Sequence, residues 1–129
     1  NWGESQMKKI KLSTAFAVAT TLAAPVHAGQ CGYDFCWGAV AFNSMTGAYG
    51  YAHSYFSEGE AASAAQQGCG YNCPEVKTFY NQCGAAAVGV TGGFGWGFGL
   101  TQYEAENVAL SYCYNYDDGC QVLVWSCSP

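Results

Sequence analysis

Residues with the chemistry of an active site are few in this sequence, and His53 is the first to consider. It is the only histidine after residue 28, and Ser54 and Ser57 follow it closely. A hydroxyl beside an imidazole can act as a nucleophile when an acid orients the ring. His53, however, continues the face that Tyr49 and Tyr51 form in an alternating segment, which indicates a residue at a strand end. We therefore predict no catalytic role for it.

Paired carboxylates could hydrolyse a glycoside if two of them faced each other across a cleft. The candidates instead fall in the first turns of two predicted helices, where negative charge complements the helix dipole. They are Glu58, Glu60, Glu104 and Glu106. Residues 117–119, Asp-Asp-Gly, are typical of a turn and lack the acidic spacing of a calcium loop. The chain is therefore predicted not to be an enzyme.

Cysteines are the other reactive groups. There are eight, at positions 31, 36, 69, 73, 83, 113, 120 and 127. An even number in a small domain with an export signal, described below, is typical of disulfides. Zinc ligation would need a different spacing, and the pair at 69 and 73 has one residue more than a redox C-x-x-C motif. The glycine-rich segment 89–99 lacks phosphate-binding motifs. We predict no metal site and no cofactor.

Aromatic residues offer a recognition surface instead. Tyrosines combine an apolar ring with a polar hydroxyl, which suits a binding surface. Several cluster in the turns that follow the two predicted helices. The candidate contact residues are Tyr71, Tyr112, Tyr114, Tyr116, Asp117 and Asp118. The remaining large aromatics are expected in the core, namely Phe42, Phe94, Trp96, Phe98 and Trp125.

The elements that position these residues come from an internal repeat, residues 39–83 and 85–127. Each copy opens with a small apolar strand and continues with alternating small and aromatic residues, which predicts a second strand with one bare face. A capping box then starts a helix at Ser57 or Thr101, each with a glutamate three residues later. The final strands are expected at 76–80 and 122–125.

The predicted order is β-β-α-β-β-β-α-β, an α+β fold. We expect a single disulfide-rich domain over residues 29–129, with one mainly antiparallel sheet and both helices on one face of it. Matched positions in the two copies favour the disulfides Cys69–Cys73 and Cys113–Cys120. Cys83–Cys127 would then join the two halves and Cys31–Cys36 would remain. This is one of 105 possible pairings.

Residues 1–28 are predicted to be an upstream remnant followed by a cleavable signal peptide. A basic start at 7–11, an apolar run of about 13 residues and small residues at Val26 and Ala28 form this pattern. The apolar run is shorter than the roughly 20 residues that cross a bilayer, so no membrane insertion is expected after cleavage. After residue 28, one lysine and eight carboxylates give a net charge of −7, with no arginine. This charge disfavours nucleic acid and anionic lipid as partners.

The ordered combination of motifs resembles a family of small exported bacterial domains, domain of unknown function 4189. The residues that carry the resemblance are 37–41, 47–51, Cys69, Cys73, 81–85, 95–97, Ala105, Glu106, Cys113, Cys120 and 124–127. The resemblance implies an exported α+β domain, in the periplasm or outside the cell. It implies no reaction.

Two binding functions remain open from the sequence. The first is an inhibitor or immunity protein that uses its acidic surface against a basic envelope partner. The alternative is a carbohydrate or peptidoglycan-binding module that uses exposed aromatic rings.

Overall fold

The computed structural model describes residues 29–129, and the predicted remnant and signal peptide at 1–28 lie outside the described residues. The element order is the predicted one. The elements are β1 (Trp37–Phe42), β2 (Tyr49–Tyr55), α2 (Glu58–Gly68), β3 (Glu75–Tyr80), β4 (Gln82–Val88), β5 (Phe94–Gly99), α3 (Gln102–Tyr114) and β6 (Gln121–Ser128). No helix within this described range is long and apolar enough to cross a membrane.

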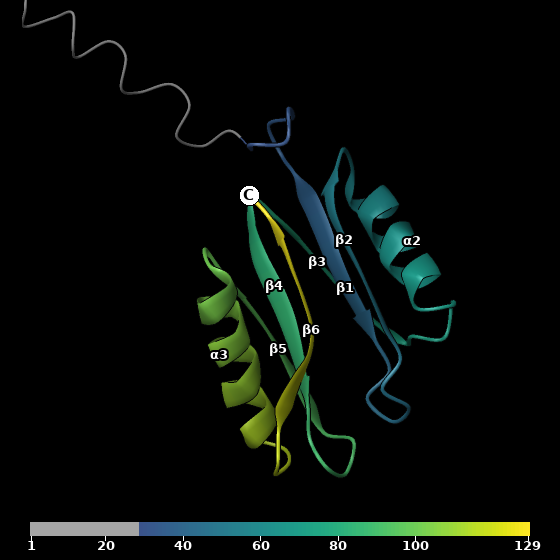
Figure 1. The fold of residues 1–129 in the computed structure, drawn as a ribbon, viewed down its shortest axis with the longest axis vertical. Helices are drawn as coiled ribbons and strands as arrows, with labels where there is room; N and C mark the ends of the chain where they lie inside the picture. The colour runs from purple at the N-terminus through teal and green to yellow at the C-terminus, as the bar shows by residue number, and fades with distance from the viewer. Residues whose placement is uncertain (1–28) are drawn as a thin grey trace, which may run out of the picture.

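The strands form two three-stranded sheets, with the orders β2-β1-β3 and β5-β4-β6, and every pairing is antiparallel. Figure 1 shows the two sheets next to each other between the helices, with α2 on one outer side and α3 on the other. The predicted α+β class is confirmed. The predicted single sheet with both helices on one face is wrong, because each β-β-α-β unit forms a sheet of its own.

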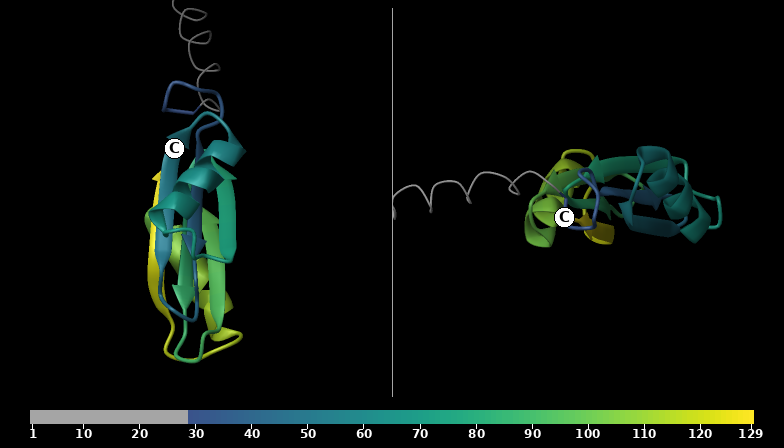
Figure 2. Two further views of the ribbon diagram at one scale, coloured as in Figure 1. Left: turned by 90° about the vertical axis from the view of Figure 1, so that its right-hand side faces the viewer. Right: turned by 90° about the horizontal axis from the view of Figure 1, so that it is seen from above.

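The central strands explain why two sheets form. In β1, Ala39 and Ala41 pack against α2, whereas Val40 and Phe42 lie in a core shared with the second sheet. All four side chains are fully buried. A strand with two apolar faces needs cover on both sides. One helix supplies the first cover and the opposite sheet supplies the second, so each unit completes the core of the other (Figure 2).

Glycine on the bare face of β5 lets α3 approach closely. A Cβ atom added to Gly97 would lie 2.6 Å from the backbone nitrogen of Ala109, and one added to Gly99 would lie 2.6 Å from Cβ of Glu104. Gly95 faces the backbone of the same helix. The alternation of glycine with aromatic residues therefore sets the distance between helix and sheet.

Both helices begin at the predicted caps. Ser57 Oγ accepts a hydrogen bond from the backbone N–H of Glu60 at 3.3 Å, and Thr101 Oγ1 accepts one from Glu104 at 3.1 Å. The glutamate of the second cap does not close a reciprocal box, because the Glu104 carboxylate accepts from the backbone N–H of Leu100 instead, at 2.8 Å. These contacts satisfy backbone donors that the first helical turn leaves open.

The four disulfides are the pairs favoured by the repeat. They are Cys31–Cys36, Cys69–Cys73, Cys83–Cys127 and Cys113–Cys120. Cys83 and Cys127 are direct partners on β4 and β6. This bridge therefore lies within the second sheet, and the expectation that it joins the two halves is wrong, because Cys83 already belongs to the second unit.

Candidate functional site

An aromatic groove lies where the edge strands β2 and β6 approach each other. Tyr49, Tyr51 and His53 alternate along β2, and the intervening Gly50 lies against the backbone of α2, so their side chains are directed away from that helix. The groove has a volume of about 440 Å³. Its lining is Tyr49, Tyr51, His53, Leu123, Val124, Trp125, Ser126 and Cys127.

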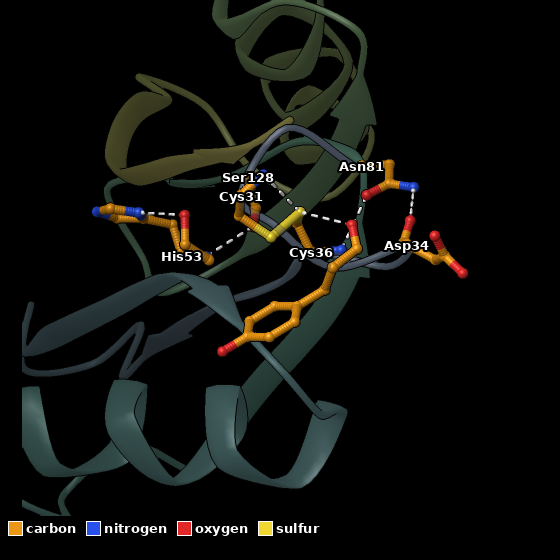
Figure 3. The surroundings of a disulfide bond; sticks show 8 residues. Cys31, Asp34, Cys36, His53, Asn81 and Ser128 are labelled. Carbon is orange, nitrogen blue, oxygen red and sulfur yellow. Dashed lines mark hydrogen bonds between the residues drawn. A yellow bond between two sulfur atoms is a disulfide. The ribbon is translucent and has the colours of Figure 1, made fainter. Parts of the chain in front are cut away.

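Two buried hydroxyls fix the walls of this groove, which we call the β2–β6 groove. Ser126 Oγ donates to the carbonyl of Ala52 at 2.9 Å, and Ser128 Oγ accepts from the backbone N–H of Ser54 at 2.8 Å. Ser54 has a left-handed backbone, with φ of 66°, at an irregularity in the β1–β2 pairing. Figure 3 shows His53 near Ser128, and His53 Nδ1 lies 3.1 Å from Ser54 Oγ. The two sheets are therefore joined by direct hydrogen bonds at this edge.

A second groove follows β5 and α3 on another side of the molecule, and we call it the β5–α3 groove. It is the larger one, at about 550 Å³. Its lining is Phe94, Gly95, Trp96, Gly97, Phe98, Val108, Tyr112 and Tyr116. Lys77 of β3 covers the Trp96 ring, with Nζ 3.8 Å from the ring centroid. Apart from the two Tyr hydroxyls and the Trp96 indole N–H, the lining side chains of this groove are apolar.

The expected core role of the aromatics holds for some positions and fails for others. Phe42 is fully buried, and Phe94 and Phe98 are packed against the shared core. Trp96 and Trp125 are 36% and 44% exposed, so their expected burial is wrong. Both lie on edge strands: Trp96 is opposite Ala86, on the face toward the first sheet, and Trp125 is opposite Ala85, on the face toward α3. The sequence pattern gives the face of a residue but not whether its strand lies at an edge.

The tyrosines predicted as one contact patch do not lie together. Tyr112 and Tyr116 line the β5–α3 groove. The Tyr114 hydroxyl donates to the carbonyl of Cys120 at 3.4 Å. Tyr71 follows α2, on the opposite outer side of the molecule from α3 (Figure 1). Because the repeat places its two helices on opposite faces, equivalent helix ends are separated.

Asp117 supports a loop. Its Oδ2 accepts hydrogen bonds from the backbone N–H groups of Thr91 and Gly93, both at 2.8 Å, and its Oδ1 accepts from Asp118 at 2.8 Å. Desolvation raises the pKa of this carboxyl, but the backbone hydrogen bonds from Asp118, Thr91 and Gly93 together outweigh it and lower the pKa to about 2. Asp117 thus holds the β4–β5 turn, and Asp118 beside it is exposed.

The other carboxylates of the two helix starts also make local bonds. Glu58 accepts from the Thr78 hydroxyl at 2.6 Å, and Glu106 accepts from Gln102 at 2.9 Å. With Glu104 bound to Leu100, negative charge is distributed over both outer sides of the molecule. The acidic balance is therefore a property of the whole surface.

Catalytic geometry around His53 is limited to the contact with Ser54, which is its neighbour in the chain. Within residues 29–129, no carboxylate is hydrogen-bonded to this ring to orient it, as a catalytic triad requires. No group of three or more His, Cys, Asp or Glu side chains in the same range is arranged to hold a metal ion.

Comparison with known proteins agrees with this fold. The family model described as domain of unknown function (DUF4189) matches residues 37–127. The NMR structure of Rv1813c from Mycobacterium tuberculosis is similar to this chain, with 31% sequence identity and a TM-score of 0.56, over 72% of this chain and 75% of that one. No curated protein matches the chain. The chain belongs to the family described as domain of unknown function 4189.

Proposed function

We propose that this protein is an exported, non-enzymatic binding domain that holds a cell-wall glycan in the β2–β6 groove. The observation that carries the proposal is the exposure of Tyr49 and Tyr51 in one groove that also contains an imidazole. Aromatic rings offer flat apolar faces to the C–H groups of a sugar ring, and Tyr and His side chains exchange hydrogen bonds with its hydroxyls.

The β2–β6 groove suits a glycan better than the β5–α3 groove because its polar groups are more varied. Binding sites combine apolar contact with a few well-placed polar groups that fix orientation. His53 and the two Tyr hydroxyls supply such groups in the β2–β6 groove. The bonds from Ser126 and Ser128 hold the strands in position, which reduces the entropy lost on binding.

The cellular setting supports an envelope ligand. Four disulfides in a domain of this size are typical of an oxidising compartment. The predicted signal peptide agrees with export to the periplasm or the medium. A net charge of −7 after residue 28 disfavours polyanionic ligands, and a glycan bound through ring faces does not depend on charge.

A cell-wall sedimentation assay tests the proposal. The oxidised protein should sediment with purified peptidoglycan in both low and high salt, because stacking is insensitive to ionic strength. Tyr49→Ala with Tyr51→Ala should abolish retention, and Tyr71→Ala, which removes a more exposed ring outside the groove, should preserve it. Retention that survives the double substitution would contradict the assignment of this groove.

A basic protein partner is the second candidate, favoured by the net charge of −7. An acidic domain that blocks a basic envelope enzyme or toxin would bind fastest at low ionic strength. Capture of one basic protein from envelope extract that is released as salt rises through about 0.5 M would support this function. Equal capture at both salt concentrations would exclude charge as its basis.

A further inference from the structure

The outer edge of β5 is an open pairing surface. β5 is the last strand of its sheet and pairs only with β4 among the described strands. The backbone N–H of Gly89 donates to the carbonyl of Gly93 at 2.8 Å. Hydrogen-bonded pairs alternate along an antiparallel ladder, so Gly95, Gly97 and Gly99 bond to β4. Phe94, Trp96 and Phe98 therefore direct their backbone N–H and C=O groups away from the sheet.

The other edges of the described sheets carry features that hinder pairing, and β5 carries none. β3 has Glu75 and Lys77, and charged side chains discourage strand addition. β2 is irregular at Ser54 and is bonded to β6 through Ser126 and Ser128. β5 consists of Phe, Gly and Trp only, and its register with β4 is unbroken. Such an edge is expected to pair with another strand.

The sequence of this edge identifies the partner strand. Residues 93–99 read Gly-Phe-Gly-Trp-Gly-Phe-Gly, which is the same in both directions about Trp96. Two such strands placed antiparallel about a twofold axis at Trp96 match Trp with Trp and each Phe with a Phe. The outward backbone groups of Phe94, Trp96 and Phe98 then form three hydrogen-bonded pairs, or roughly six hydrogen bonds. A self-complementary strand fits the symmetry of an isologous dimer.

The side chains of α3 beside this edge are also complementary to those of the second copy across the twofold axis. A Cβ atom on Gly95 would meet Tyr112, and one on Gly97 would meet Val108. The twofold axis places Gly95 opposite Gly97 of the second copy, so each Tyr112 lies across from the smaller Val108. Both side chains line the β5–α3 groove, which offers about 550 Å³ to them.

We propose that two copies of this protein associate through antiparallel pairing of β5 with β5, which joins their second sheets into one six-stranded sheet. The β2–β6 grooves are outside this interface, so the dimer does not depend on the glycan proposal. Each copy has a charge of −7 after residue 28, and the mutual repulsion weakens the dimer at low ionic strength. The dimer should therefore tighten as salt is added, opposite to binding of a basic protein.

Sedimentation equilibrium of the oxidised protein at low and high salt tests this interface. Wild type should be dimeric at high salt, and Trp96→Lys, which places two like charges on the axis, should raise the dissociation constant at least about tenfold. Tyr51→Lys is the matched control, because Tyr51 has the same place on β2 as Trp96 has on β5, opposite Val40 and Ala86 respectively. It should leave the dimer unchanged.

Amide hydrogen exchange of the wild type gives a second readout that needs no variant. The amides of Phe94, Trp96 and Phe98 should become protected as the protein concentration rises, and the amides of Tyr49 and Tyr51 on the β2 edge should not. A protein that stays monomeric at high salt and millimolar concentration overturns the proposal. So does a dimer in which Trp96→Lys folds and associates like the wild type, or in which these three amides gain no protection.

Discussion

Lys77 Nζ lies 3.8 Å from the centroid of the Trp96 ring, and this contact joins β3 of the first sheet to β5 of the second. Lys77 is the only lysine or arginine after residue 28. Its distance to Glu75 is 3.9 Å, at the limit of an ion pair on a partly exposed surface. The ring contact thus links the two sheets on the β3–β5 side, as the hydrogen bonds of Ser126 and Ser128 link them on the β2–β6 side.

Replacing this lysine tests the contact. Lys77→Met keeps most of the aliphatic length and removes the charge, so it should lower the free energy of unfolding by about 0.5–1 kcal/mol. Lys77→Arg should retain stability, because a guanidinium also stacks on an indole ring. Urea denaturation monitored by tryptophan fluorescence measures both. Equal stability of the Met variant and the wild type would show that the contact contributes nothing.

The lowered pKa of Asp117 predicts that the stability of the protein depends on pH. Its pKa falls from 3.8 to about 2 on folding, so the unfolded state binds a proton more readily than the folded state does. Asp117 thus stabilises the fold fully above about pH 5, and this contribution is lost as pH falls from there toward pH 2. The Asp117→Asn variant should be less stable than the wild type at pH 7, and the two proteins should be about equally stable near pH 2. Unfolding curves across this range measure it, with exposed Asp118→Asn as the control.

The loss of stability on removing a disulfide should increase with the length of chain that the bridge closes. Cys83 and Cys127 are separated by 44 residues, and Cys69 and Cys73 by 4. Double substitution by serine should cost roughly 4 kcal/mol for the first pair and roughly 2 kcal/mol for the second. Denaturation of both variants under oxidising conditions measures the difference. A larger loss from the short bridge would contradict this ranking.

The equivalent position in the first sheet is held without a bridge. Trp37 pairs with Tyr80 across β1 and β3 as Cys83 pairs with Cys127 across β4 and β6. The two rings lie 5.0 Å apart between centroids. The repeat therefore preserves the place of a cross-strand contact, and an aromatic pair in one unit replaces the covalent bond of the other.

The glycine face of β5 predicts a steric effect. Gly97→Ala adds a Cβ atom 2.6 Å from the backbone of Ala109, which cannot move without shifting α3. Overpacking of this kind should cost about 1–3 kcal/mol. Gly59→Ala in the first turn of α2 is the matched control, because nothing lies within 4 Å of its added Cβ. Thermal unfolding should show loss of stability in the first variant and a neutral or stabilising effect in the second.

The sequence by itself determined the elements, their order and the α+β class. Its repeat also favoured the four cysteine pairs, since matched positions in two copies have matched surroundings. These properties depend on local periodicity, capping residues and chain spacing, which act over a few residues.

The tertiary structure alone decided how the two units meet. Apolar residues on both faces of β1 and β4 require two covers, but the sequence does not say whether a helix or a second sheet supplies each one. That choice placed the helices on opposite sides, separated Tyr71 from Tyr112 and exposed Trp96 and Trp125 at strand edges. It also created the β2–β6 and β5–α3 grooves, whose walls come from residues distant in the chain. Long-range packing, which no local pattern encodes, therefore set the candidate sites.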